Sequence, residues 1–169
     1  MRVVLIAAIT ADGFIGQSDH HTADWTGGED KKEFVRLTKE LGVVIMGSNT
    51  YATIGRALPG RRNIMYTSRP TENAIDGVET TDEAPEALIK RLEQQGHSSV
   101  AICGGTSIYS QFMEAGLVTE LYLMVIPVLF GTGLYLFNTP LSTQLHLLDS
   151  ETLSDGVMML HYVVDSTLA

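Results

Sequence analysis

The sequence predicts an α/β protein with a mostly parallel central sheet, helices on both faces and an antiparallel hairpin at the C-terminus. Largely apolar runs, such as residues 43–46 and 99–103, alternate with segments whose apolar residues recur at helical spacing. Apolar runs are typical of strands buried on both faces, and their alternation with helices favours parallel pairing. A turn signal, Ser154-Asp155-Gly156, joins the last two strand-like segments. We expect one domain over residues 1–169.

The N-terminal third begins with a strand and a helix separated by a long loop. Residues 2–9 are largely apolar and predict a buried strand. Residues 10–28 contain four glycines and the only tryptophan, so we expect an irregular segment there. A helix is predicted over 29–41 because Phe34 and Leu37 lie on one apolar face.

The remaining elements follow from the same two periodicities. A strand over 43–46 leads into polar residues that begin a short helix, Ser48–Ile54. Asp82 is a candidate N-cap for a helix that runs to about residue 95, and Pro85 suits its first turn. The other expected elements are a strand with polar ends over 62–67, a short strand over 78–80, apolar strands over 99–103 and 121–129, the hairpin arms 144–153 and 157–164, and a helix over 107–115.

Charge and composition exclude several classes of function. The chain carries 11 Lys and Arg against 20 Asp and Glu, which gives a net charge of −9 and a pI of about 4.9. No basic face offsets phosphate repulsion, so we expect no nucleic-acid partner. No apolar run approaches the ~20 residues that cross a bilayer, so we expect no membrane partner. One cysteine, Cys103, excludes an internal disulfide and favours a cytoplasmic location.

Positive charge gathers in one short stretch of this acidic chain. Arg56, Arg61 and Arg62 lie within seven positions, around the turn Leu58-Pro59-Gly60. The polar helix start at Ser48 lies just before them and offers free N–H groups to an anion. An anionic ligand of an acidic protein must meet local positive charge, so this stretch is a candidate binding segment.

The same stretch resembles dihydrofolate reductases. The elements that match that family in order and spacing, without a gap, are Met46-Gly47, Thr50-Tyr51, Ile54-Gly55-Arg56, Leu58-Pro59-Gly60-Arg61 and Asn63. The resemblance covers most of the chain. It implies the fold of that family, hydride transfer from NADPH to dihydrofolate as a small-molecule substrate, and no metal or covalent step. The chain is then a monomer or a homodimer.

Asp30 is the candidate catalytic carboxylate. Trp25 precedes it by five residues and Phe34 follows it by four, as in dihydrofolate reductases. The resemblance implies that Asp30 accepts two hydrogen bonds from a pterin, for which a carboxylate presents two acceptors in one plane. A second interpretation is that Asp30 only favours the helix dipole in the first turn. Glu29 is the alternative carboxylate.

The rest of the substrate site also follows from the resemblance. It implies that Arg61 holds the glutamate tail of folate, because a guanidinium fork fits a carboxylate. Arg61 as a solvated turn residue is the other interpretation, and we expect Arg56 and Arg62 at the surface. The residues implied to bind substrate are Ala8, Asp30, Phe34, Ile54, Leu58 and Arg61, and those implied in catalysis are Asp30, Trp25 and Tyr109.

The glycine pair Gly104-Gly105 marks the candidate cofactor site. A strand, two glycines and a helix start let backbone approach a pyrophosphate, and the resemblance implies a cis peptide between the glycines. The family's third glycine and its arginine are Thr106 and Ser107 here. The resemblance favours NADPH over NADH as the cofactor. The family's basic residue after the Met-Gly pair is Ser48 here, and we expect Arg69 to meet the 2′-phosphate in its place. The residues implied to bind cofactor are Ala8, Ile15, Gly16, Gly47, Ser48, Asn49, Thr50, Thr67, Ser68, Arg69, Cys103, Gly104, Gly105, Thr106, Ser107, Ile108 and Tyr109.

Residues 12–16 match the loop that closes over nicotinamide in that family, and a glycine-rich loop suits a lid. His20 and His21 follow in the same loop. Two adjacent histidines without a third ligand do not complete a tetrahedral metal site, so we expect exposed loop histidines.

A second resemblance leaves the substrate open. The segment 12–16 and the C-terminal half, with Gly116-Leu-Val-Thr-Glu-Leu121 and Pro127-Val-Leu-Phe-Gly-Thr-Gly133, also look like the reductase of bacterial riboflavin biosynthesis. Met124 stands where many dihydrofolate reductases have a threonine beside the pterin. Three functions follow: dihydrofolate reduction, which the Leu58-to-Arg61 segment favours, reduction of a ribosylamino-pyrimidine phosphate, and pterin or nucleotide binding without turnover.

Overall fold

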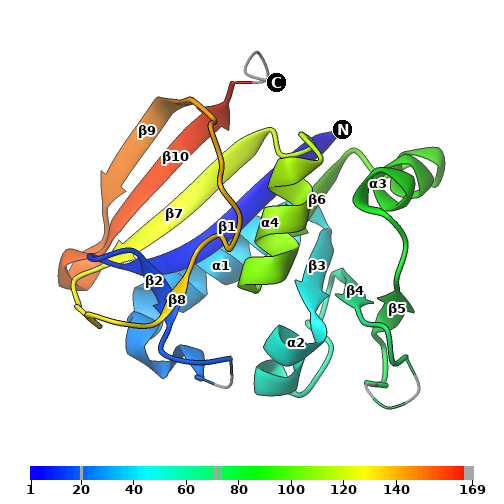
Figure 1. Cartoon of the computed structure of the whole chain (residues 1–169), viewed down its shortest axis with the longest axis horizontal. Coiled ribbons are helices and arrows are strands. Elements are labelled where there is room, and N and C mark those ends of the chain that lie inside the picture. Colours follow the sequence, from blue (N-terminus) through cyan, green and yellow to red (C-terminus); the bar gives the residue numbers. More distant parts are fainter. Residues whose placement is uncertain (20, 71, 73, 166–169) are drawn as a thin grey trace.

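An eight-stranded sheet forms the centre of the protein (Figure 1). The computed structural model describes residues 1–19, 21–70, 72 and 74–165. The strands of the sheet, in spatial order, are β5 (Glu79–Thr81), β4 (Arg62–Tyr66), β3 (Val43–Gly47), β6 (Ser99–Ile102), β1 (Arg2–Thr10), β7 (Glu120–Ile126), β10 (Met158–Val164) and β9 (Leu145–Thr152). The first six run parallel to one another, β10 is antiparallel to β7, and β9 is antiparallel to β10. The predicted fold class is therefore confirmed.

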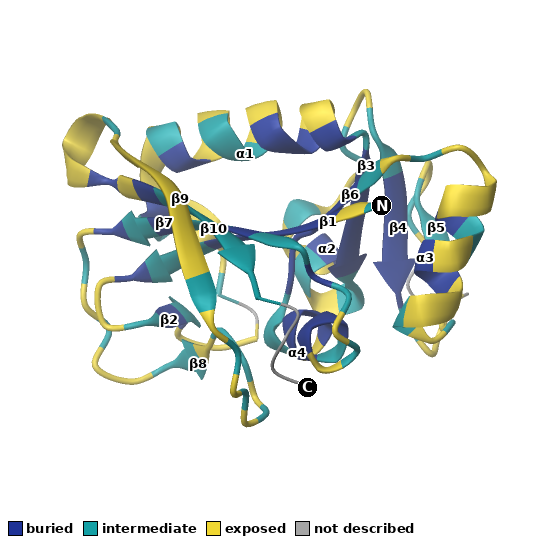
Figure 2. Cartoon of the chain, turned by 90° about the horizontal axis from the view of Figure 1, so that it is seen from above, coloured by how far each residue is buried: buried dark blue, intermediate teal, exposed yellow. Residues whose placement is uncertain are grey.

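Helices cover both faces of the sheet. The helices are α1 (Gly27–Leu41), α2 (Ser48–Ile54), α3 (Pro85–Gln94) and α4 (Thr106–Glu114), with short 3-10 turns η1 (Ala23–Thr26) and η2 (Ser154–Gly156). Figure 2 shows α1 along one face and α4 on the opposite face, with the outer side of α1 exposed. Each helix therefore buries one apolar face, as its spacing of apolar residues predicts.

The core is two apolar layers separated by the sheet. One cluster joins α3 and α4 to the sheet, and Phe112 at its centre is fully buried, edge-on to the ring of Tyr66 at a centroid distance of 6.0 Å. The other cluster joins α1 and α2 to the opposite face through Leu37, Leu41 and Tyr51. Alternate residues of each strand serve opposite layers, which explains why strands such as β3 are apolar throughout.

Some boundaries differ from expectation for local reasons. Asp82 is not the N-cap of α3, because the helix begins at Pro85 with Ala84 in the capping position. Strand β7 ends at Ile126, before Pro127, which lacks the N–H that pairing needs. The segment expected to be irregular over 10–28 contains β2 (Phe14–Gly16), which pairs with β8 (Leu134–Tyr135), and the turn η1.

One buried amide side chain holds the turn before β4. Asn63 Oδ1 accepts hydrogen bonds from Leu58 N at 2.7 Å and from the Tyr51 hydroxyl at 3.2 Å. Its Nδ2 donates to Leu58 O at 3.0 Å and to Arg61 O at 2.7 Å. Asn63 thereby fixes the conformation of residues 58–61, which follow α2 along the chain.

We expect Asn63→Ala to lower the free energy of unfolding by about 2–3 kcal/mol, because the buried Tyr51 hydroxyl and three part-buried backbone groups of Leu58 and Arg61 lose their partner. Urea unfolding would measure the loss. Asn138→Ala is the matched control, since the hydrogen bond recorded for Asn138 uses its backbone N–H, which donates to Ser110 Oγ. Equal stability of the two variants would contradict this role of Asn63.

Candidate active site

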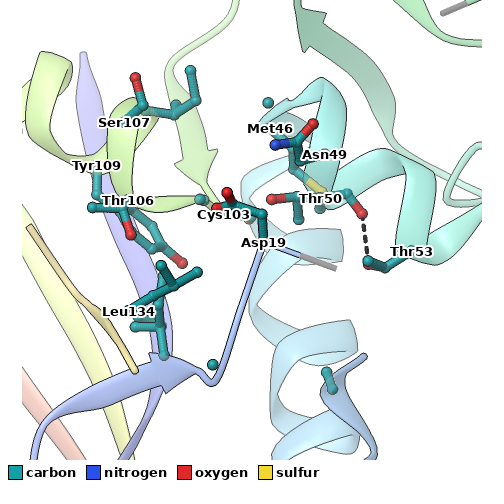
Figure 3. A pocket seen from close by; sticks show the side chains of 18 of the residues that line it. Asp19, Met46, Asn49, Thr50, Thr53, Cys103, Thr106, Ser107, Tyr109 and Leu134 are labelled. Atoms are coloured by element: carbon teal, nitrogen blue, oxygen red, sulfur yellow. Dashed lines mark hydrogen bonds between the residues drawn. The ribbon is translucent and has the colours of Figure 1, made fainter. Parts of the chain in front are cut away.

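The carboxyl ends of the parallel strands open into one cleft of about 1270 Å³. It is bounded by α1, by the starts of α2 and α4, and by the β2–β8 pair (Figure 3). In open α/β sheets ligands bind beyond the carboxyl ends of the strands, and this cleft occupies that position. Its volume exceeds the 300–1,000 Å³ typical of single-ligand pockets, so it has room for a cofactor and a substrate together.

Asp30 is a buried carboxylate in the wall of this cleft. It lies in the first turn of α1, and only 7% of its surface is exposed. Burial raises the pKa of Asp30, and the Thr26 side chain offsets part of the increase. Trp25 lines the cleft beside it and packs edge-on against Phe130 at 5.1 Å. A buried carboxylate with a raised pKa in a cleft wall is a candidate functional residue.

Apolar side chains surround Asp30. Phe34 and Ile54 line the cleft from α1 and α2, and Leu58 follows from the turn that Asn63 holds. Met124 is buried on β7 opposite Ala8 of β1, and both line the cleft. This part of the cleft is suited to a flat ring with polar edges, because a carboxylate faces it among apolar walls.

Glycines bring β3 and β6 close together at their carboxyl ends. Gly47 N donates to Gly104 O at 2.7 Å, and the Gly104–Gly105 peptide is cis, as the resemblance predicted. A Cβ on Gly104 would lie 3.0 Å from the Tyr109 hydroxyl, and one on Gly47 would lie 3.2 Å from Ile108. Only glycine fits at Gly104, where φ is also +105°.

Tyr109 is fixed beneath these glycines. Its buried hydroxyl donates to Ile6 O at 2.7 Å, and burial raises the pKa of Tyr109 well above its ordinary value. The hydroxyl is therefore neutral and already used as a donor. Tyr109 lines the cleft as a positioning group, and its predicted catalytic role stays a prediction.

The start of α4 presents backbone N–H groups to the cleft. Gly105 occupies the N-cap position without a side-chain cap bond, and Thr106 and Ser107 line the cleft. The first N–H groups of a helix have no partner within the helix, so this end attracts anions. The Thr106 hydroxyl donates to Tyr135 O at 2.8 Å, which ties β8 to the helix start.

Most of the predicted site residues meet in this cleft. Those that line it are Ala8, Ile15, Gly16, Trp25, Asp30, Phe34, Gly47, Ser48, Asn49, Thr50, Ile54, Leu58, Thr67, Ser68, Cys103, Gly104, Gly105, Thr106, Ser107, Ile108 and Tyr109. Arg61 and Arg69 do not line it, so the structure does not bring these two to the others. Burial raises the pKa of the Cys103 thiol, which is consistent with an inert core residue.

Arg61 lies behind the cleft, against α1. Its Nη1 donates to Thr38 Oγ1 at 2.7 Å and its Nε donates to Pro59 O at 3.1 Å. Glu29, the alternative carboxylate, is half-buried on α1, pairs with Lys32 and does not line the cleft. Arg56 was expected at the surface and is indeed exposed, yet it also borders the cleft.

The first residue of the glycine-rich segment 12–16 is hydrogen-bonded to the end of β1 and to the loop at 130–131. Asp12 accepts hydrogen bonds from the Thr10 hydroxyl at 2.6 Å and from Gly131 N at 2.7 Å. His21 packs against Phe130 at a ring-centroid distance of 5.5 Å, and its Nδ1 accepts a hydrogen bond from Gln17 N at 3.1 Å. His20 lies outside the described residues. Within the described ranges, no three His, Cys, Asp or Glu side chains are grouped to hold a metal ion.

Sequence reasoning missed several residues that line the cleft. They are Asp19, Lys31, Thr53, Tyr66, Asp82, Glu83, Leu134 and Tyr135, among others. Lys31 directly follows Asp30 on α1, so its place next to the candidate carboxylate could have predicted that it lines the cleft. Tyr66 ends an apolar strand and has a buried hydroxyl without a partner among the described residues. Leu134 and Tyr135 belong to a two-residue strand too short for any periodicity to reveal.

Comparison with known proteins gives a consistent family. A family model described as dihydrofolate reductase matches residues 2–153. The chain is 35% identical over 130 residues to dihydrofolate reductase HdrB of Haloferax volcanii, which covers 72% of this chain and 66% of that protein. It is 28% identical over 171 residues to the uncharacterized protein YwjB of Bacillus subtilis, which covers 96% of this chain and 97% of that one.

Solved structures show the same fold. A putative riboflavin biosynthesis protein from Shewanella sp. PV-4 superposes with a TM-score of 0.80 at 21% identity, over 98% of this chain and 99% of that chain.

In the part of the chain that is described, no helix has the length and apolar character that crossing a membrane requires.

The raised pKa of Asp30 predicts how stability depends on pH. The folded protein holds this proton more tightly than the unfolded chain, so stability falls as the pH rises from about 3.8 through the raised folded value. We expect Asp30→Asn to be more stable than wild type at pH 7 and to lose that advantage below pH 3.8. Urea unfolding over a pH series would measure it, with the exposed Asp76→Asn as control. A variant no more stable than wild type at pH 7 would contradict the burial cost.

Proposed function

The chain belongs to the dihydrofolate reductase family, and we propose that it catalyses the NADPH-dependent reduction of 7,8-dihydrofolate to tetrahydrofolate. The observation that carries this proposal is Asp30, a buried carboxylate among apolar walls in a cleft large enough for two ligands. The family makes the chain an oxidoreductase, and the cleft supports a flat nitrogen heterocycle as its substrate.

The cleft fits a nicotinamide dinucleotide. Gly47 and Gly104 line the cleft without side chains, and Ile108 and Tyr109 occupy the space that a Cβ would need, so backbone rather than side chain is presented to a ligand here. The N–H groups at the start of α4 face the same space and suit a pyrophosphate. NADPH, when bound, supplies the hydride that is transferred to pterin C6.

Asp30 holds and orients the pterin. Its two oxygens accept hydrogen bonds from the 2-amino group and from the adjacent ring N–H of the pterin, and this pair of bonds fixes the ring plane. The apolar neighbours exclude water from the hydride path, which strengthens these hydrogen bonds. The proton on N5 comes from water, with the Asp30 charge favouring the reactive form of the ring. Positioning two reactants side by side supplies much of the rate.

Positive side chains at the cleft mouth suit the glutamate tail. Lys31 and Arg56 border the cleft from α1 and the end of α2. Arg61 stands against Thr38, and its Nη2 has no partner among the described residues. Because Arg61 does not line the cleft, the tail carboxylate must extend beyond the cleft wall, between α1 and the turn at 58–61, to reach this guanidinium.

Reduction of a ribosylamino-pyrimidine phosphate is the second candidate. Met124 in place of a hydroxyl beside Asp30 weakens a pterin-specific network, and Lys31 and Arg56 are equally able to meet a terminal phosphate. Loss of NADPH absorbance with each substrate in turn distinguishes the two functions. Binding of NADPH with turnover of neither substrate would favour a binding protein without catalysis.

We expect Asp30→Asn to lower the rate of dihydrofolate reduction at neutral pH by a factor of roughly 10² or more, on the scale usual for acid–base assistance. The amide replaces one acceptor by a donor, so the pterin edge is mismatched. Steady-state assays would measure it. Glu29→Gln is the matched control, because Glu29 is the neighbouring carboxylate on α1 and does not line the cleft. Near-normal turnover of the Asp30 variant would remove this residue from the site.

Arg61→Ala is expected to raise the KM for dihydrofolate by about tenfold with little change in kcat, because it removes a charged hydrogen bond to the tail. A pterin substrate that lacks the glutamate tail should not distinguish the variant from wild type. The control is Arg36→Ala, whose guanidinium pairs with Glu33 on the exposed side of α1. A change confined to NADPH affinity would show that Arg61 does not hold the tail.

A further inference from the structure

One end of the cleft lies over strands β4 and β5 and carries carboxylates where a phosphate-binding site needs cations. We call it the nucleoside end; its residues are Thr67, Ser68, Asp82 and Glu83, all of which line the cleft. Strands β6, β3, β4 and β5 are consecutive neighbours in the sheet. At about 4.8 Å per strand, the nucleoside end is roughly 10–14 Å from the Gly104–Gly105 turn. That is the reach of a nucleoside attached to a pyrophosphate at the start of α4.

Glu83 contributes little net charge to this end. Arg91 of α3 donates to Glu83 Oε1 at 2.7 Å, and these hydrogen bonds lower the pKa of Glu83. Arg91 also pairs with Glu79 at 2.9 Å, which in turn pairs with Arg62 at 2.8 Å. The two arginines are thus shared between two carboxylates, and neither arginine lines the cleft.

Asp82 is the uncompensated charge. It is exposed at the cleft wall, three residues before α3 begins, and no ion pair or hydrogen bond of its side chain is recorded among the described residues. Arg69, the cation expected here from the sequence, is 72% exposed, pairs with Glu72 at 3.5 Å and does not line the cleft. A ligand at the nucleoside end therefore meets one free carboxylate and no lining cation.

The remaining lining groups at this end are neutral. Thr67 and Ser68 add only hydroxyl groups, and next to this end Ser48 and Asn49 begin α2 with a hydroxyl and an amide where a basic residue would place a cation. In dinucleotide sites a carboxylate accepts a hydrogen bond from the ribose 2′-hydroxyl of NADH, whereas an arginine accommodates the 2′-phosphate of NADPH. Neutral donors can bind either group, but a carboxylate repels the phosphate.

We propose that Asp82 determines cofactor preference and makes this protein bind NADH to within about tenfold of NADPH, a difference of only ~1.4 kcal/mol. Asp82 accepts the 2′-hydroxyl of NADH, and the neutral donors hold the 2′-phosphate of NADPH against its repulsion. The proposal rests on the proposed function only in so far as the cleft binds a nicotinamide dinucleotide, and it is independent of which heterocycle is reduced.

The test is calorimetric titration of the full chain with NADPH and with NADH at low ionic strength. Wild type should bind the two within about tenfold of each other. Asp82→Asn should tighten NADPH binding roughly threefold to tenfold and leave NADH binding equal or weaker, because repulsion of the phosphate is removed. Asp149→Asn is the matched control, since Asp149 lies on β9 at the opposite edge of the sheet. Ser48→Arg should tighten NADPH binding alone.

Two results would overturn the proposal: a preference of wild type for NADPH of about a hundredfold or more, or an Asp82→Asn variant with unchanged NADPH affinity. Failure of the proposed function looks different. If both dinucleotides bind with the expected ratio but dihydrofolate is not reduced, the substrate assignment fails and the role of Asp82 stands. If neither dinucleotide binds, both proposals fail.

Discussion

The close contact between the ends of β3 and β6 is the constraint on which the cleft depends. The Gly47 N–H and the Gly104 carbonyl meet at 2.7 Å, and Tyr109 fills the space beneath with its hydroxyl on Ile6. Any side chain at Gly104 would displace Tyr109 and, with it, the start of α4. Because α4 and α2 both begin within three residues of these glycines, this one contact fixes where their polar first turns lie.

The second feature that defines the cleft is the buried charge of Asp30, which lowers the stability of the folded protein. Asp30 sits among apolar groups, so its charged form costs free energy that a neutral residue in the same place would not. Proteins retain such residues where function uses them, and a stability cost beside a cleft is itself a functional signal. Asn63 works in the opposite direction, since every polar atom of its side chain is paired and the turn it holds is rigid.

Charge is unevenly distributed along the cleft. Lys31 and Arg56 border the side where α1 and α2 meet, whereas Asp82 faces the side over β4 and β5. In the two proposals, the anionic substrate tail meets Lys31 and Arg56, and the uncharged ribose hydroxyl meets Asp82. Under the proposed function, this polarity assigns the two ligands to distinct ends of one cleft, although the protein as a whole is acidic.

Much of this arrangement follows from local sequence. Apolar runs fixed which segments are strands, the helix Ser48–Ile54 has the predicted bounds, and the Trp25-Asp30-Phe34 spacing located the buried carboxylate. The strands and the helix depend on neighbours in the chain, so periodicity and capping chemistry reveal them. The buried carboxylate was located by the resemblance to dihydrofolate reductases, which the spacing of Trp25, Asp30 and Phe34 carries. The pairing of β2 with β8 and the turning of Arg61 toward Thr38 were not predictable. The free carboxylate of Asp82 was not predictable either, because it depends on where the chain brings Arg91 and Glu83 together. Contacts between segments far apart in sequence are decided by packing, which leaves no local pattern.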